Sequence, residues 1–302
     1  MLFEEASERF LKYVTRRHVK QGLYNITQDF NNKILNYFKG KDIFELNKID
    51  FLDWQEYIIS HDYSNSYNKL LYYYINSFLD FCCAYLNLPI NYMREIGEFP
   101  KKVEKDKHDF YTLKEFKQFI KCVSTPEYQC FFYIMFYVGT RPSECMALKF
   151  SDLNGNFLTI DKSLERHGQR NICTTKNSSS IRTIVIDRKL RKMILKLKKY
   201  YFNKYGTFNN DYFICGGVKP LSPTSIDRYK LKACKLANLR VITQHQFRSS
   251  HATLLTSHNV PVNEVARRLG HSNIETTIKR YIRFDKSQEK RVLRTLNFLR
   301  FI

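Results

Sequence analysis

Apolar residues recur at helical spacing through the first part of the chain. The clearest stretch runs from Leu70 to Leu88, where large apolar side chains are three or four residues apart and therefore share one face of a helix. Those positions are Leu71, Ile75, Phe78, Leu79, Cys82 and Leu86. Asn76, Asp80 and Asn87 interrupt the stretch, so the pattern predicts a helix packed in a core rather than one that spans a membrane.

The helical pattern breaks in front of a charged segment. Pro89 and Pro100 interrupt it, and the run from Lys101 to Lys107 mixes lysines with acidic residues. A stretch of this kind packs poorly and is typical of an interdomain linker. We therefore expect two domains. The predicted division is a helical domain at residues 1–100, a linker at residues 101–110 and a second domain at residues 111–302.

The start of the second domain carries two helix signals. Thr112 and Glu115 have the spacing of a capping box, in which each side chain bonds a backbone amide of the other residue. Further along, Gly139 ends a strongly apolar run, and Pro142 suits the first turn of another helix. Arg141 is therefore expected at a helix start.

Residues 154–187 show a different pattern. Asn154-Gly155 favours a turn, and β-branched residues concentrate at residues 157–160, 171–175 and 182–186. These runs predict a small antiparallel sheet. Helical periodicity returns at Lys189 and continues, with short breaks, to a C-terminal helix. The expected fold is mainly α with a small antiparallel β-sheet, in two domains.

The charge balance of the chain indicates a polyanionic partner. Lysine and arginine number 50 against 29 aspartates and glutamates, which leaves a formal charge of +21. A field of one sign and this size attracts phosphates, and each neutralised DNA phosphate releases a counterion, so binding should weaken with salt. A merely basic protein without such a partner is the alternative interpretation of the charge alone.

The cysteines and the N-terminus bear on the compartment. The eight cysteines have no CxxC motif and no paired metal-ligand spacing, so we expect free thiols in a reducing cytosol. The chain begins with acidic residues where a signal peptide would carry basic ones. The expected location is cytoplasmic, with no membrane partner.

Several separated segments of the second domain hold informative polar residues. They are Gly139-Thr140-Arg141-Pro142-Ser143-Glu144, the turn at Lys176, His245-Gln246-Phe247-Arg248, Leu269-Gly270-His271, and Tyr281. Their order and spacing resemble the tyrosine recombinase family of phage-type integrases. In that family the catalytic set is an arginine in a G-x-R-x-x-E motif, a hairpin lysine, an H-x-x-R pair, a histidine after Leu-Gly and a nucleophilic tyrosine.

The resemblance implies a role for each matching position. Tyr281 would be the nucleophile, and Glu144 would support the catalytic residues from behind. The remaining catalytic positions would be Arg141, Lys176, His245, Arg248 and His271. The residue after His245 departs from the family, because Gln246 stands where an aspartate is common, which leaves open how Arg248 is supported.

The chemistry of phosphodiester cleavage explains why these residue types are wanted. The transition state gathers negative charge on the non-bridging oxygens, which planar guanidinium groups such as those of Arg141 and Arg248 bind well. A free tyrosine has a pKa of about 10, so the site must favour its deprotonation. Histidines can donate to the phosphate or move a proton, and Lys176 could protonate the departing 5′ oxygen.

The resemblance also implies an activity and its partners. The chain would be a site-specific DNA recombinase that cleaves and rejoins strands through a 3′-phosphotyrosyl intermediate, after a helical core-binding domain has clamped double-stranded DNA. We expect a monomer in free solution, a homotetramer on two synapsed sites, and accessory directionality factors. We expect no metal and no cofactor, because the sequence has no H-E-x-x-H, no P-loop and no carboxylate cluster spaced for magnesium.

Three alternatives remain. Residues 262–281 taken alone would also suit a helix-turn-helix, although such a motif needs none of the upstream residues. A DNA-binding regulator on the same fold, with catalysis lost, should lack a catalytic residue, and none is missing. A type IB topoisomerase shares the chemistry, but the segment after Tyr281 resembles the terminal helix of a recombinase.

Overall fold

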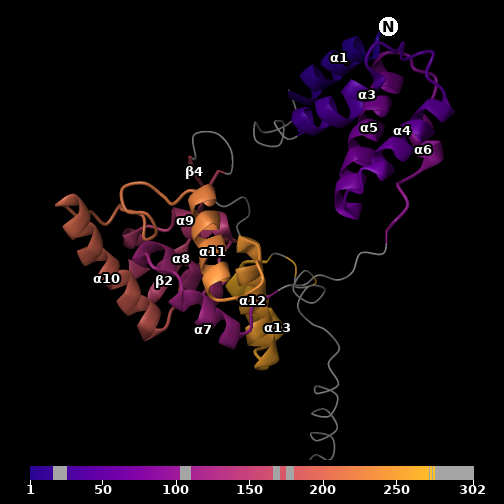
Figure 1. The fold of residues 1–302 in the computed structure, drawn as a ribbon. Coiled ribbons are helices and arrows are strands. Elements are labelled where there is room, and N and C mark those ends of the chain that lie inside the picture. The colour runs from indigo at the N-terminus through magenta and orange to yellow at the C-terminus, as the bar shows by residue number, and fades with distance from the viewer. Residues whose placement is uncertain are drawn as a thin grey trace, which may run out of the picture. The chain divides into compact units, whose positions relative to one another are not determined.

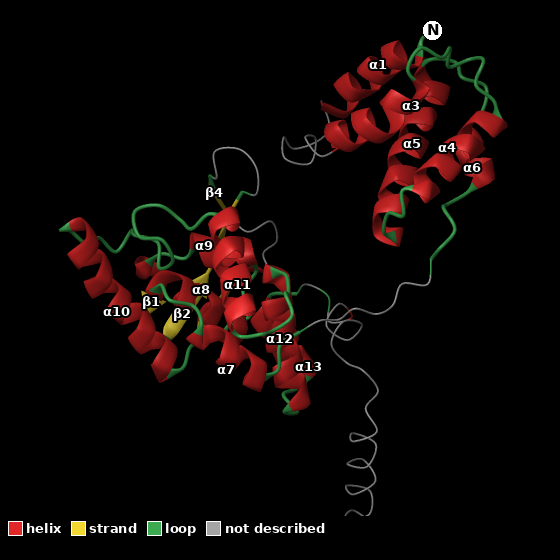
Figure 2. Ribbon diagram, viewed as in Figure 1, coloured by secondary structure: helices red, strands yellow, loops and turns green. Residues whose placement is uncertain are grey.

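A computed structural model gives the fold of the chain in two compact units, residues 1–107 and residues 108–302 (Figure 1). The structure describes residues 1–15, 26–102, 110–165, 171–174 and 180–271, together with Asn273 and Glu275. Each unit is considered by itself. In the described ranges the chain is mainly helical with short antiparallel strands (Figure 2), so the predicted fold class is confirmed.

The first unit is a helical bundle with an aromatic core. Its elements are α1 (Phe3–Thr15), the π-helical turn η1 (Asn31–Leu35), α3 (Asn36–Phe38), α4 (Lys48–Ser60), α5 (Asn65–Tyr85) and α6 (Tyr92–Ile96). The helical face predicted around Leu71 is confirmed, because Leu71, Ile75, Phe78, Leu79 and Cys82 are all buried in α5. Phe3 stacks on Phe38 and packs at a tilt against Phe78, with ring centroids of Phe3 and Phe78 4.8 Å apart, which connects α1 to α5.

The second unit contains both predicted helix starts. Its helices are α7 (Leu113–Lys121), α8 (Pro126–Tyr137), α9 (Pro142–Ala147), the 3-10 turn η2 (Phe150–Asp152), α10 (Arg188–Tyr205), α11 (Pro223–Leu236), α12 (Gln244–Ser257) and α13 (Val262–Leu269). Thr112 and Glu115 form the expected capping box at the start of α7. Arg141 is the residue that precedes α9, with Pro142 in its first turn, as predicted.

The β segment forms two small sheets instead of the single sheet that the pattern predicted. The strands are β1 (Leu153–Asn154), β2 (Phe157–Ile160), β3 (Lys162–Leu164), β4 (Ile172–Thr174) and β5 (Arg182–Val185). One antiparallel sheet has the order β1-β2-β5, and the other pairs β3 with β4. The difference arises because β3, the partner of β4, is too short to show an alternation of its own, so the pattern did not indicate the second sheet.

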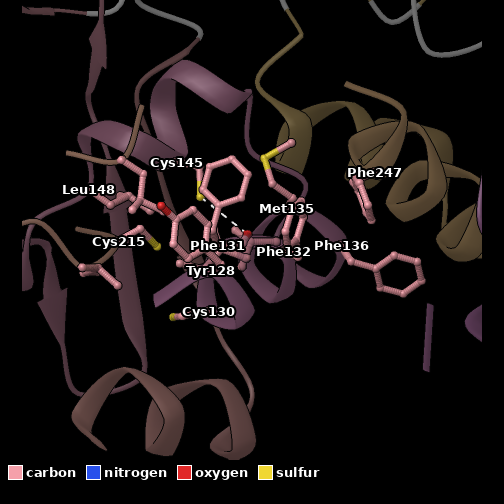
Figure 3. Close-up of a cluster of buried hydrophobic side chains, with 14 of the residues drawn as sticks. Tyr128, Cys130, Phe131, Phe132, Met135, Phe136, Cys145, Leu148, Cys215 and Phe247 are labelled. Carbon is pink, nitrogen blue, oxygen red and sulfur yellow. Dashed lines mark hydrogen bonds between the residues drawn. The ribbon is translucent and has the colours of Figure 1, made fainter. Parts of the chain in front are cut away.

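Helix α8 forms the centre of the second unit, where it contacts α7, α9, α10 and α12. Its buried side chains cover nearly its whole circumference, as Figure 3 shows around Phe131, Phe132 and Met135. Phe136 stacks on Phe116 of α7 with ring centroids 3.9 Å apart, and Phe247 brings α12 into the same cluster. A rigid apolar core therefore fixes the starts of α9 and α12, which carry the predicted site residues.

Two further observations concern the compartment. All eight cysteines are free thiols, and five of them are buried. Within the described ranges, none of the helices combines the length and the apolar character that a membrane crossing would need.

Candidate active site

The first predicted site residue, Arg141, is placed by a glycine. Gly139 has a φ of +75°, a left-handed conformation that side chains adopt only with strain, and it turns the chain from α8 into α9. Its missing Cβ leaves room for a neighbour, because a Cβ there would lie 2.4 Å from Cδ2 of His251. The Arg141 side chain remains 36% exposed, so it can reach a ligand.

Glu144, the predicted supporting residue, forms two hydrogen bonds with Arg141. The carboxylate accepts from the backbone N–H of Arg141 at 2.8 Å and from its Nη1 at 2.7 Å. Glu144 is 1% exposed. Burial raises the pKa of its carboxyl, but the hydrogen bond and charge of Arg182, with those of Arg141, outweigh that effect and hold the pKa below its usual value. Glu144 is therefore a charged carboxylate at neutral pH.

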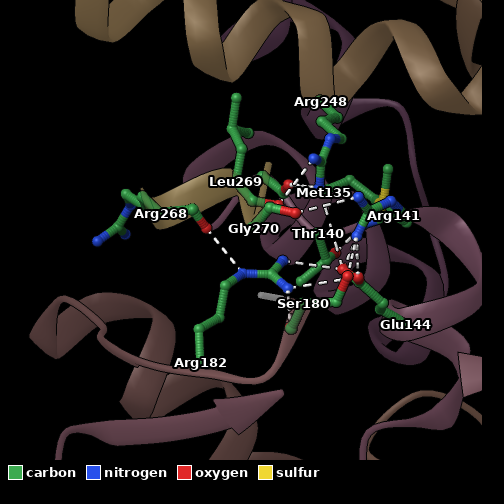
Figure 4. A network of polar contacts seen from close by, with 11 residues as sticks. Met135, Thr140, Arg141, Glu144, Ser180, Arg182, Arg248, Arg268, Leu269 and Gly270 are labelled. Carbon is green, nitrogen blue, oxygen red and sulfur yellow. Dashed lines mark hydrogen bonds and ion pairs between the residues drawn. The ribbon is translucent and has the colours of Figure 1, made fainter. Parts of the chain in front are cut away.

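The C-terminal end of α13 is held by three arginines from three different elements (Figure 4). The carbonyl of Arg268 accepts from Arg182 Nε at 2.8 Å, that of Leu269 from Arg248 Nη2 at 2.7 Å, and that of Gly270 from Arg141 Nη2 at 3.2 Å. The last carbonyls of a helix lack partners within the helix and carry partial negative charge. Cationic donors therefore stabilise this helix end, and the end in turn orients the guanidinium groups.

Arg248 is more deeply placed than the sequence suggested. Its side chain is 1% exposed, and its Nη1 also donates to the carbonyl of Gly139 at 2.8 Å. Its distance to the Glu144 carboxylate is 4.0 Å. Gln246, which stands where the family commonly has an aspartate, accepts from the backbone N–H of Thr243 in a capping box at the start of α12. Arg248 is instead supported by the two backbone carbonyls and by the nearby carboxylate of Glu144.

His245 lies in the first turn of α12, where it is exposed at a groove of about 430 Å³. Pro142 and Ser143, which follow Arg141 directly, line the same groove, so His245 and Arg141 flank one surface. His271 is half-buried and follows Gly270, whose carbonyl holds Arg141. Arg141 and Arg248 thus meet at the end of α13, directly before His271, and His245 lines a groove with the two residues that follow Arg141.

Two predicted residues, Lys176 and Tyr281, lie outside the described residues, as does the segment predicted to form a C-terminal helix. The strands on either side of Lys176 are described, and Ser180, at the start of the following segment, accepts from Arg141 Nη1 at 3.4 Å. The described parts of the chain contain no group of three histidine, cysteine or acidic side chains arranged to hold a metal ion.

A third histidine, His251, supports the site from within the core. Its Nδ1 lies 2.8 Å from the carbonyl of Phe136, and its Nε2 accepts from Arg268 Nε at 3.3 Å. Nδ1 must therefore carry the proton. Burial, followed by the charge of Arg268, lowers the pKa of His251 to about 3, so the ring is neutral at physiological pH. His251 thus joins the end of α13 to the end of α8.

One residue of the site, Arg182, was not identified by the motifs. It forms a salt bridge with Glu144 at 2.8 Å, and its side chain is 5% exposed. The alternation of residues along the strand did indicate that Arg182 points inward. Ile184 and Ile186 alternate along the last β run and are buried, and Arg182 falls on the same face two residues earlier. A charge on the inward face of a strand requires a partner, and the nearest acidic residue in the predicted site was Glu144.

Comparisons with known proteins agree with this geometry. The sequence profile of the Phage integrase family matches residues 110–288. The ICEBs1 integrase of Bacillus subtilis (strain 168) is 27% identical over 279 residues, which cover 89% of this chain and 75% of that protein. The integrase of Staphylococcus phage L54a is 24% identical over 335 residues, with 99% and 93% covered.

Solved structures share the fold. A lambda integrase dimer bound to a COC′ core site has a TM-score of 0.76 and 16% identity, over 95% of this chain and 80% of that one. The Tn1549 transposon integrase in complex with transposon right end DNA has a TM-score of 0.73 and 16% identity, over 98% and 100%. Lambda integrase has also been solved as a tetramer on a Holliday junction. This chain belongs to the phage integrase family and is a tyrosine-type site-specific recombinase that acts on DNA.

Proposed function

We propose that this recombinase cleaves one DNA strand by attack of Tyr281 on a phosphodiester held by Arg141, His245 and His271. The observation that carries the proposal is the cluster of guanidinium groups at the end of α13, beside His271 and at the start of α9. The products would be a 3′-phosphotyrosyl link and a free 5′ hydroxyl. Attack by the hydroxyl of a partner strand would then rejoin the backbone.

Exposure suggests different tasks for the two arginines. Arg141 is 36% exposed and can donate directly to a non-bridging oxygen. Arg248, at 1% exposed, adds positive charge at short range in this state, where the apolar surroundings keep the charge poorly screened. Both contributions favour the transition state, because it carries more negative charge than the ground state.

The remaining chemistry is proton transfer. The phenol of Tyr281 must lose a proton, and His245 and His271 are the candidate acceptors or phosphate donors. Lys176 would protonate the departing 5′ oxygen. We expect the chain to need neither a metal nor a cofactor, since cationic side chains supply the charge that a metal would otherwise provide.

We propose that the helical unit at residues 1–100 clamps the DNA from the side opposite the catalytic domain at residues 111–302, with residues 101–110 as the linker. The charge of +21 supports a wide phosphate contact. The lambda integrase tetramer on a Holliday junction supports a homotetramer on two synapsed sites. We further propose that it assembles from monomers in a bacterial or phage-infected cell, with accessory directionality factors. Free thiols and a DNA substrate suit the cytoplasm.

The test is covalent trapping on a nicked duplex. A bound site is first selected from a random duplex library, and a nick is then placed beside each candidate scissile phosphate so that the released fragment diffuses away. The wild-type protein should form an adduct that survives a denaturing gel, whereas Tyr281→Phe should form none. Tyr205→Phe, at an exposed tyrosine of α10, is the matched control and should react as the wild type does.

Three results would count against the proposal. An adduct formed by Tyr281→Phe would remove Tyr281 from the role of nucleophile. Tight site-specific binding without an adduct from the wild type would instead favour a DNA-binding regulator on this fold. Relaxation of supercoiled DNA without strand exchange would point to topoisomerase activity.

A further inference from the structure

One buried carboxylate serves three guanidinium groups in this site. Glu144 lies 2.7 Å from Arg141 Nη1, 2.8 Å from Arg182 Nη2 and 4.0 Å from Arg248 Nη1. The cluster therefore holds an excess of two positive charges. Which of the arginines Glu144 neutralises decides how much positive charge is left for a phosphate.

The geometry favours Arg182 as the partner of Glu144. Arg182 Nη1 and Nη2 approach the two carboxylate oxygens at 3.3 and 2.8 Å, a two-pronged contact that is stronger than a single one. Both side chains are almost fully buried, at 5% and 1% exposed. Arg182 also donates to the carbonyls of Ser180 and Arg268, so none of its bonds is directed to the outside.

We propose that Arg182 is a positioning residue that balances the charge of Glu144, so that Arg141 and Arg248 keep their full positive charge for the scissile phosphate. The proposal rests on the proposed function. Glu144 fixes the orientation of Arg141, but its negative charge alone would weaken the attraction of Arg141 and Arg248 for a phosphate. With Arg182 present, Glu144 still orients Arg141, and the site keeps the positive charge that attracts the phosphate.

The position of Arg182 gives it a second effect. Its hydrogen bond to the carbonyl of Ser180 holds the described segment that follows Lys176 in the chain. Its hydrogen bond to the carbonyl of Arg268 holds the helix end that precedes His271. One side chain therefore connects Glu144, β5 and α13. A substitution should act through these neighbours, because Arg182 itself is too deeply buried to touch DNA.

The experiment compares two substrates in single-turnover cleavage. One carries a normal scissile phosphodiester, and the other carries a methylphosphonate, in which a methyl group replaces one charged non-bridging oxygen. Arg182→Met should slow cleavage of the phosphodiester by roughly tenfold or more, and cleavage of the methylphosphonate by less than about threefold, because the neutral substrate needs less positive charge. Arg182→Lys should recover part of the lost rate.

A double substitution separates charge balance from folding. Glu144→Gln combined with Arg182→Met restores the excess of two positive charges and keeps an amide oxygen that can accept from Arg141. This double variant should cleave the phosphodiester faster than Arg182→Met alone. Arg191→Met, at a half-buried arginine of α10, is the matched control and should leave both rates unchanged.

Equal slowing of both substrates by Arg182→Met would overturn the proposal, because a purely structural defect does not distinguish the charge of the substrate. A double variant slower than Arg182→Met would overturn it as well. Failure of the proposed function is recognised separately, since the wild type would then form no covalent adduct with either substrate.

Discussion

The close approach of α12 and α13 to Gly139 makes this glycine a sensitive point of the second unit. In Gly139→Ala, a Cβ would lie 2.4 Å from Cδ2 of His251 and 3.0 Å from Cδ2 of Leu269. Both neighbours are buried side chains with little space to move. The substitution should therefore push apart the end of α8 and the end of α13, and disturb the two carbonyls that hold Arg248.

The size of the effect can be estimated from two contributions. A side chain in the left-handed region costs about 1–2 kcal/mol, of which the stiffer unfolded chain offsets about 0.4–1 kcal/mol. Overpacking of a well-filled core adds about 1–3 kcal/mol. We expect a loss of about 3 kcal/mol, which corresponds to a fall in Tm on the order of 10 °C for a unit of this size.

Gly155→Ala is the matched control, because Gly155 has a φ of +59° but no atom within 4 Å of the added Cβ. It should lose only the conformational part, about 1 kcal/mol. Circular dichroism during urea or thermal unfolding measures both variants. Trp54, the single tryptophan, is buried in the first unit, so its fluorescence should keep the wild-type midpoint. Equal destabilisation by the two alanines would refute the predicted collision.

Two other predictions concern α12. His251 has a pKa of about 3 when folded against 6.5 when unfolded, so the unfolded chain binds the extra proton between these values, and stability should fall by up to about 1.4 kcal/mol per pH unit as the pH drops from 6.5 toward 3. Urea midpoints across this range should slope less in His251→Gln, and an identical slope would exclude His251 as the cause. Gln246→Ala should lose the capping box with Thr243 and about 1 kcal/mol, whereas Gln246→Glu keeps it. Urea midpoints that do not distinguish the two substitutions would contradict the role of Gln246 as a cap.

The sequence could predict elements whose cause is local. The capping box of Thr112, the proline start of α9 and the apolar face of α5 all follow from neighbouring residues, and the structure has them where the pattern put them. The pairing of β3 with β4 could not be predicted, because a strand of three residues has no periodicity, and its partner is fixed by the rest of the fold.

The candidate site also has parts that the sequence predicts and parts that it does not. The motifs pointed to Arg141, Glu144 and Arg248, which the fold brings together, and to His271 and His245, which lie at the end of α13 and at a groove beside the start of α9. The depth of Arg248 could not be predicted, because its burial depends on contacts such as that with the Gly139 carbonyl, 109 residues away in the chain. The inward position of Arg182 on its strand was predictable, but its salt bridge with Glu144 depends on how β5 packs in the fold. The roles of Lys176 and Tyr281 remain predictions from the motifs.

The three arginine contacts at the end of α13 also limit the length of the chain in this region. Exposed positions such as Asn263 can change in side chain without altering which carbonyl faces which arginine. One residue inserted between Pro261 and Arg268 would instead rotate every following carbonyl by about 100° around the helix axis. Relatives that keep this arrangement should therefore vary at the exposed positions of α13 but not in the number of its residues.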